Sequence, residues 1–456
     1  MPVPVTRSGR SAVFSCALLT CVLLGGAMTL DGCATYHPAP LPTVTELPPD
    51  IAHLQGAPSD GRALDLMTIE RLVLLNNPDL RSARAQHRLA QAQMLQTGLL
   101  PNPAINGSAG YLISGVGNAT AWTAGISQDI RSLVTLAPRR QAAKAAAAQV
   151  DASLLWQEWQ TIGKARLLFV DLVESERLRA LQSRTLEQLE QRSTQLHQSI
   201  AQGNTDLTAA SPDFVAAADA RTAYDDLQRR LLGQRHDLAA LLGVVADASI
   251  PLPATVDMHI ADAEHVRASA QGIEHRRPDL VALQLGYQSQ EATLRGAVLA
   301  QFPMFSLGYA ASQDNSRVRN GGPAVTFDLP IFDRNQGNIA IAKATRRQLR
   351  DEYTARLASA HGEIVAMLTE QTQASTQLAA LLPTLPAALR DANQASSAQQ
   401  QGLIDLRTYV DLLVAAQSRQ AAAVTLQQIV LEQQVAMDTL LGTGMPDSLP
   451  QDVIAP

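Results

Sequence analysis

The sequence predicts a mainly α-helical protein with a small β part, built as two copies of one long-helix hairpin unit. Three observations support this fold class. Landmarks recur along the chain at a spacing near 200 residues, and helical segments of unusual length follow them. Residues 325–331 alternate apolar and polar side chains. A period of two is typical of a strand with one apolar face.

The composition suits long, thin helices better than one thick globular core. Hydrophobic residues make up 46% of the chain, but aromatic residues only 4%, and Ala and Gln are abundant. The net charge of −6 gives no indication of nucleic-acid binding. No run of about 18 apolar residues follows residue 30, so we expect no transmembrane helix in a mature chain.

Residues 1–33 are predicted to be an export signal that ends in a lipoprotein box. Arg7 and Arg10 give a positive start, and residues 12–30 are mostly apolar. The segment Leu30-Asp31-Gly32-Cys33 resembles a bacterial lipoprotein box, which predicts lipidation of Cys33. Asp31 departs from the small residue usual at its position, so a plain signal peptide or membrane anchor is the alternative.

An internal duplication sets the domain organisation. The tetrapeptide NPDL at 77–80 recurs as RPDL at 277–280, and Gly203-x-x-Asp206-Leu207 recurs as Gly402-x-x-Asp405-Leu406 at an offset of 199. Each copy is predicted to run helix, strand, strand, long helix, turn, helix. The expected parts are the signal (1–33), a Pro-rich extension (34–64), a first repeat (65–243), a connector (244–264), a second repeat (265–442) and a C-terminal tail (443–456).

Each copy contributes two candidate strands. In the first copy, two sets of alternating apolar residues are Ile105, Ala109, Tyr111 and Ile113, and Trp122, Ala124, Ile126 and Ile130. In the second copy, we expect a polar loop at 313–322 and then the strand at 325–331. Four strands cannot close a barrel, and β-structure in a membrane must close, so a membrane role requires several protomers. The alternative is a soluble sheet that caps a helical bundle.

The long helix of the first copy is predicted over residues 139–202. At 1.5 Å per residue it would extend on the order of 95 Å. Part of it has the 3-4 spacing of a coiled coil; the residues are Leu186, Leu189, Ser193, Leu196 and Ile200. An ordinary amphipathic core helix is the alternative reading of this stripe.

Taken together, these motifs resemble the outer-membrane efflux (TolC) family over about residues 65–442. The segment at 330–338, PIFDRNQGN, is most similar to the branch that exports heavy-metal cations. The resemblance implies a homotrimer whose strands form a 12-stranded outer-membrane β-barrel. It also implies an α-helical tunnel through the periplasm, a periplasmic adaptor protein and an inner-membrane pump as partners, and outer-membrane lipid around the barrel.

The resemblance places function at the two Gly-x-x-Asp-Leu turns, which would form the periplasmic tip where an adaptor docks. The predicted docking residues are Gly203, Asp206, Leu207, Gly402, Asp405 and Leu406. Each Gly suits a helix C-cap and each Asp an N-cap, so purely structural roles are the alternative. Asp411 is a candidate gate carboxylate. Its counterpart in the first copy is Pro212, so Asp213 is the nearest candidate there.

No enzyme motif is present, and we expect no cofactor and no metal site. His259 and His265, in or beside the connector, are more typical of surface residues than of ligands. Three functions remain open at this stage: a passive efflux duct for heavy-metal cations or small toxic organic compounds, a periplasmic adaptor, and a structural coiled-coil lipoprotein. Two copies with two strand pairs favour the duct.

Overall fold

The computed structural model describes residues 36–44, 47–58, 62–303 and 305–443. The chain divides into two compact units, Met1–Glu46 and Leu47–Pro456. In the first unit, residues 36–44 are exposed and form neither helix nor strand. The predicted lipidation site, Cys33, lies outside the described residues, as does the predicted tail from residue 444 onward.

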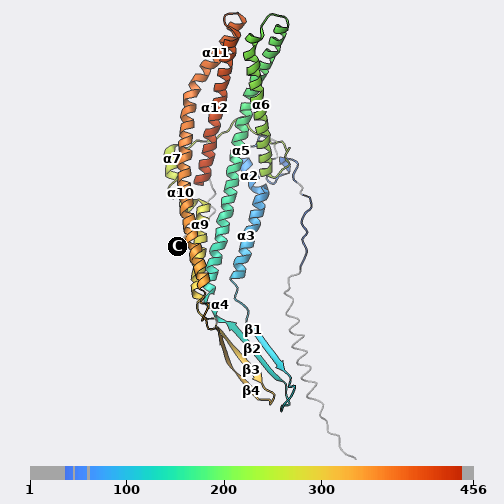
Figure 1. Ribbon diagram of the computed structural model, residues 1–456, viewed down its shortest axis with the longest axis vertical. Coiled ribbons are helices and arrows are strands. Elements are labelled where there is room, and N and C mark those ends of the chain that lie inside the picture. The colour runs from blue at the N-terminus through green and yellow to red at the C-terminus, as the bar shows by residue number, and fades with distance from the viewer. Residues whose placement is uncertain (1–35, 45–46, 59–61, 304, 444–456) are drawn as a thin grey trace, which may run out of the picture. The chain divides into compact units, whose positions relative to one another are not determined.

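The second unit contains all the helices and strands described here, and they repeat in the predicted order (Figure 1). The predicted extension contains η2 (Ile51–His53). The first copy comprises α2 (Leu66–Asn76), α3 (Pro78–Thr97), β1 (Ala104–Gly110), β2 (Ala121–Asp129), α4 (Ile130–Val134), α5 (Leu136–Ala201) and α6 (Leu207–Leu242). The second comprises α7 (Ala263–Ser269), α8 (Ile273–Arg276), α9 (Pro278–Leu299), β3 (Phe305–Gln313), β4 (Arg319–Phe327), α10 (Gln336–Leu381), η3 (Leu382–Thr384), α11 (Leu385–Gln400) and α12 (Leu406–Leu441). The predicted mainly α fold with four strands is confirmed.

The long helix is continuous in the first copy only. Helix α5 has 66 residues, which corresponds to roughly 100 Å. Its counterpart is divided into α10 and α11 by the 3₁₀ turn η3. Pro383 and Pro386 lie at this division, and proline removes a backbone donor and clashes with the preceding turn. The long helix predicted for the second copy is therefore present, with 46 residues in α10, but a 3₁₀ turn interrupts it before α11.

Helix α5 is the common packing partner of both copies. It contacts α2, α3 and α6 of the first copy and α9 and α12 of the second. The largest buried cluster includes Phe169 and Leu172 of α5, Leu238 of α6, and Leu431 and Val435 of α12. In the coiled-coil stripe, Leu186 and Leu189 are buried. The hydrophobic core therefore joins the two repeats along one helix.

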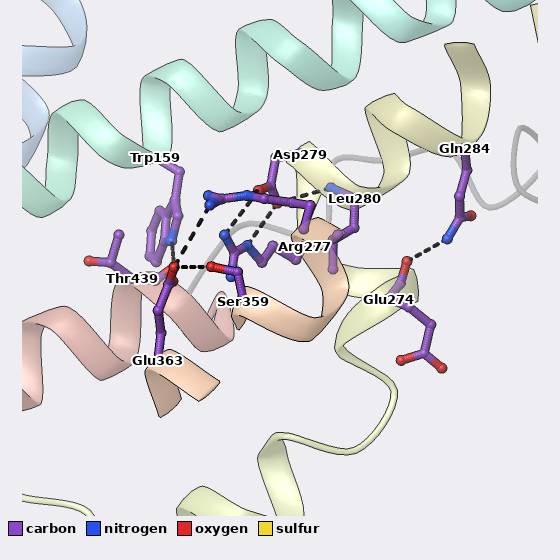
Figure 2. A network of polar contacts seen from close by, with 10 residues as sticks. Trp159, Glu274, Arg277, Asp279, Leu280, Gln284, Ser359, Glu363 and Thr439 are labelled. Atoms are coloured by element: carbon purple, nitrogen blue, oxygen red, sulfur yellow. Dashed lines mark hydrogen bonds and ion pairs between the residues drawn. The ribbon is translucent and has the colours of Figure 1, made fainter. Parts of the chain in front are cut away.

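The two proline-containing openings are stabilised differently. Asn77 caps α3 by accepting a hydrogen bond from the Leu80 amide at 3.0 Å. At the matching position, Arg277 is fully buried and donates to Asp279 at 2.8 and 2.9 Å (Figure 2). Asp279 also accepts from Arg356 of α10 at 2.8 Å. The buried ion pair therefore ties the start of α9 to α10.

The four strands form one antiparallel sheet in the order β1-β2-β3-β4. The β2–β3 pairing joins the two copies, with Trp122 opposite Gln313 and Asp129 opposite Ser306. Directly paired residues share a face of the sheet. Register therefore gathers the large apolar side chains on one face: Ile105, Trp122, Ile126, Phe305, Leu307, Tyr309, Val325 and Phe327. Gln128, Gln313 and Arg319 are the polar exceptions there.

The other face of the sheet carries small and polar residues. They include Asn106, Ser108, Thr123, Ser127, Asp129, Ser306, Ser312, Asn320 and Thr326. The Ser108 and Thr123 hydroxyl oxygens lie 2.7 Å apart across the β1–β2 pair. The apolar face is not covered by the described residues, since Ile105 is 84% exposed and Val325 is 52% exposed. Within the described chain, β1 and β4 each have a hydrogen-bonded neighbour on one side only.

Several predicted strand boundaries are wrong. Strand β4 begins at Arg319, inside the predicted loop, because backbone pairing with β3 extends through the small residues that follow. The loop shrinks to 314–318, where Asp314 accepts hydrogen bonds from the Ser316 and Val318 amides. At the other end β4 stops at Phe327, before Pro330. In the first copy, β1 ends before Tyr111 and Ile113, and Ile130 already belongs to α4.

Beside the apolar core, a polar seam holds α5 against α12. Gln428 Nε2 donates to Asp171 Oδ1 at 3.1 Å and to Glu432 Oε1 at 2.7 Å. Burial raises the pKa of Glu432 to about 7, and the hydrogen bond to Asp171 and its negative charge act in the same direction. Burial likewise raises the pKa of Glu174 in α5. With a pKa of about 7, Glu432 is protonated below neutral pH and is divided between its protonated and charged forms near pH 7.

This seam predicts a loss of stability as pH rises. Between the ordinary Glu pKa near 4.5 and the folded value of about 7, the folded chain retains a proton that the unfolded chain has released. The stabilisation is therefore complete at low pH and is lost as pH rises through about 7. Glu432→Gln should flatten part of this decline in thermal-unfolding midpoints measured across the window, while exposed Glu187→Gln should not. If the midpoints of Glu432→Gln fall with pH as steeply as those of the wild type, the protonation of Glu432 is not a cause of the decline.

Candidate functional site

The two Gly-x-x-Asp-Leu turns have the same geometry. Gly203 and Gly402 both have φ of 73°, a left-handed conformation that costs a residue with Cβ roughly 1 kcal/mol. Asp206 and Asp405 cap the returning helices by accepting from the Ala209 and Thr408 amides, both at 2.7 Å. Hydrogen bonds from Thr408 hold the pKa of Asp405 below its usual value. Both aspartates therefore act as helix N-caps, the structural alternative that the sequence analysis left open.

The apolar side chains at these turns are not equivalent. Leu207 is 65% exposed and Leu403 is 72% exposed, whereas Leu406 is half-buried. The sequence pointed to Leu406 and missed Leu403, which lies inside the turn where no helix face covers it. Its counterpart in the first copy is Asn204, which is polar. The tip therefore presents one exposed leucine from each hairpin, at different positions of the turn.

The two gate candidates also have different surroundings. Asp213 of α6 is buried and forms an ion pair with Arg192 of α5. Burial raises the pKa of Asp213, and Arg192 opposes that shift. The Arg192 guanidinium also lies 4.7 Å from the centre of the Tyr409 ring of α12. The Asp213 side chain is therefore held within the helix packing.

Asp411 lies on a groove between the two helical hairpins. Its side chain is 70% exposed, and the nearest cation is Arg407, 4.0 Å away on the same helix. The groove has a volume of about 890 Å³ and runs between α5, α6 and α12. Apolar side chains line much of it, among them Leu189, Val215 and Val414. The structure thus brings Asp411 to an accessible surface, whereas Asp213 is buried.

The described residues contain no group of three or more His, Cys, Asp or Glu side chains arranged to hold a metal ion. His259 and His265 are exposed at the surface. Among the helices of the described chain, none combines the length and apolar character needed to cross a membrane. The arrangement at the tip suits contact with another protein, through exposed leucines beside well-capped turns.

Residues 270–443 match the family model described as outer membrane efflux protein. No curated protein sequence matches the chain. The Campylobacter jejuni CmeC outer membrane channel has a TM-score of 0.70 at 16% identity, covering 92% of this chain and 96% of that one.

Two further solved structures show the same fold. The open state of the Neisseria gonorrhoeae MtrE outer membrane channel has a TM-score of 0.67 at 18% identity, covering 88% of this chain and 97% of that one. CusC, solved in a study of folding and transmembrane channel formation, has a TM-score of 0.66 at 18% identity, covering 90% and 99%. The predicted resemblance to the outer-membrane efflux (TolC) family is therefore confirmed, by residues 270–443 in sequence and by most of the chain in fold.

Proposed function

We propose that this protein is the outer-membrane channel of a tripartite efflux system. Three copies would join their sheets into one barrel, with the helices extending into the periplasm as a tunnel. The protein would act as a passive duct, and it needs no catalytic group for that role. The proposal rests mainly on the two faces of the sheet. One face carries exposed apolar side chains, and the other carries small and polar side chains.

The physical argument concerns the backbone at the sheet edges. An exposed apolar face suits lipid, but unpaired backbone groups at β1 and β4 would be costly in a membrane. Pairing β4 of one copy with β1 of the next satisfies those groups and closes the sheet. The small polar residues would then line a water-filled interior. Bacterial barrels have at least about eight strands, which one copy cannot supply.

The helix tips support the assignment of partners. The turns at 202–206 and 401–405 would meet a periplasmic adaptor protein, which in turn links the duct to an inner-membrane pump. Cys33 would carry a lipid that anchors the N-terminus to the membrane. The segment 330–338 supports heavy-metal cations as cargo, with small toxic organic compounds as the other class.

A periplasmic adaptor and a structural coiled-coil lipoprotein are the competing functions. Neither has a need for a sheet whose exposed face is apolar over four strands. An adaptor would also need only one helical hairpin, whereas this chain has two. The duct therefore accounts for more of the described chain than either alternative.

Leu403→Asp tests the tip. A carboxylate at this 72%-exposed position should weaken adaptor binding and abolish export. The purified channel should keep its trimeric mass in light scattering and its conductance in planar bilayers, because the tip and the sheet lie at opposite ends of the long helices (Figure 1). Asn204→Asp, the matching position of the first copy, is the control for added charge. Normal export by Leu403→Asp would refute a docking role.

Asp411→Ala tests the gate. If this exposed carboxylate faces the duct, three copies form a ring that attracts cations, and its loss should reduce the cation preference of the bilayer conductance. Arg407→Ala, one turn earlier, removes the neighbouring opposite charge and should increase that preference. Identical ion selectivity in all three proteins would exclude Asp411 as a gate residue.

A further inference from the structure

A cleft of about 560 Å³ lies where the helices meet the sheet. Its walls come from α4, the start of α5, the ends of α3 and α9 and the start of α10, next to the point where β2 ends at Asp129. Small side chains such as Ala142, Ala146 and Ala292 form one side. The proposed function does not use this cleft.

The cleft is positively charged. Arg131 and Arg139 line it, and no Asp or Glu does. Arg139 Nη2 donates to the Ser132 carbonyl at 3.3 Å, but its Nε is buried without a hydrogen-bond partner. In the part of the chain that the structure describes, no carboxylate forms an ion pair with either arginine. A buried donor without a partner is unfavourable, so an acceptor at this position would stabilise it.

The hydroxyl groups of the cleft are already committed. Thr135 donates to the Arg131 carbonyl at 3.0 Å, and Thr293 donates to the Ser289 carbonyl at 2.9 Å. Asn335 Nδ2 donates to the Ala297 carbonyl at 2.8 Å. The two guanidinium groups are therefore the main donors available to a ligand. Guanidinium groups match phosphate oxygens in geometry and charge.

Exposed aromatic and apolar residues surround the same end of the sheet. Phe302 is 66% exposed and Phe332 is 92% exposed, and Phe327, Leu329 and Ile331 are also exposed. Outer-membrane barrels carry girdles of aromatic residues at both boundaries between membrane and water, and the three phenylalanines suit such a girdle. If the sheet spans the membrane as proposed above, the cleft lies at the level of the periplasmic headgroups.

We propose that this cleft binds the phosphate of an anionic lipid headgroup through Arg131 and Arg139. The inference rests on the proposed function for its membrane placement, but its chemistry depends only on the cleft. The small residues of α5 and α9 leave room for the glycerol part of the lipid. Free inorganic phosphate shares the recognised group and is the alternative source.

The test measures binding to the purified full-length protein in detergent by native mass spectrometry. The probes are dihexanoyl phosphatidylglycerol, dihexanoyl phosphatidylcholine and inorganic phosphate. Phosphatidylglycerol should bind most tightly, and Arg131→Gln and Arg139→Gln should each weaken it about tenfold. Arg131→Lys should retain part of the affinity. Arg334→Gln, an exposed arginine near the same junction but outside the cleft, should leave it unchanged.

Three results would overturn the inference. Equal affinity of the wild type and both glutamine variants for phosphatidylglycerol would exclude the two arginines as lipid-binding residues. Inorganic phosphate that binds as tightly as phosphatidylglycerol would make the cleft a site for free phosphate. Loss of the trimer in Arg131→Gln with unchanged lipid affinity would assign the cleft to a subunit contact. Bilayer conductance of the same wild-type sample separates the two proposals. A wild type that conducts but does not bind the lipid overturns only the lipid site. A folded wild type that never conducts contradicts the proposed channel function.

Discussion

Antiparallel pairing of β2 with β3 is the interaction on which the proposed channel depends. It joins strands that are almost 200 residues apart in sequence and so links the two repeats at the sheet. Its register also sorts every neighbouring side chain, placing Ile126 beside Tyr309 on one face and Ser127 beside Gly308 on the other. A shift of one residue would reverse both faces. In the proposed channel, the lipid-facing side and the water-facing side of the sheet are therefore set by one pattern of backbone hydrogen bonds.

The helical part meets a different constraint, because two hairpins must stay parallel over a great length with few aromatic residues. Helix α5 packs against helices of both copies and so holds the two hairpins together along their length. Polar contacts along α5 also fix which helices pack against it. The Asp171–Gln428–Glu432 seam joins α5 to α12. Nearer the tip, Arg192 of α5 contacts both Asp213 of α6 and Tyr409 of α12. Buried carboxylates cost free energy unless they are protonated or paired, and both solutions occur here.

Local signals made the turns and repeats predictable from sequence. Gly203 and Asp206 define a C-cap and an N-cap within four residues, so no tertiary information was needed. Features set by packing could not be found in this way. The strand residue Arg319 is extended because β3 pairs with it, and Asp213 is buried because Arg192 approaches from another helix. Leu403 was missed since its exposure depends on the path of the turn. The two junction arginines lie close in sequence, but the cleft that they line was missed because α9 and α10 supply its other walls.

The most direct test of the channel is to determine the surroundings of neighbouring residues on β4. Single cysteines at Val325 and Thr326, introduced with the chain's own Cys16, Cys21 and Cys33 replaced by serine, would carry spin labels on opposite faces of the sheet. In lipid vesicles, the label at 325 should be relaxed by dissolved oxygen, which concentrates in lipid. The label at 326 should respond instead to a water-soluble nickel chelate. Equal access of the chelate to both positions would contradict a membrane-spanning sheet and the duct built on it.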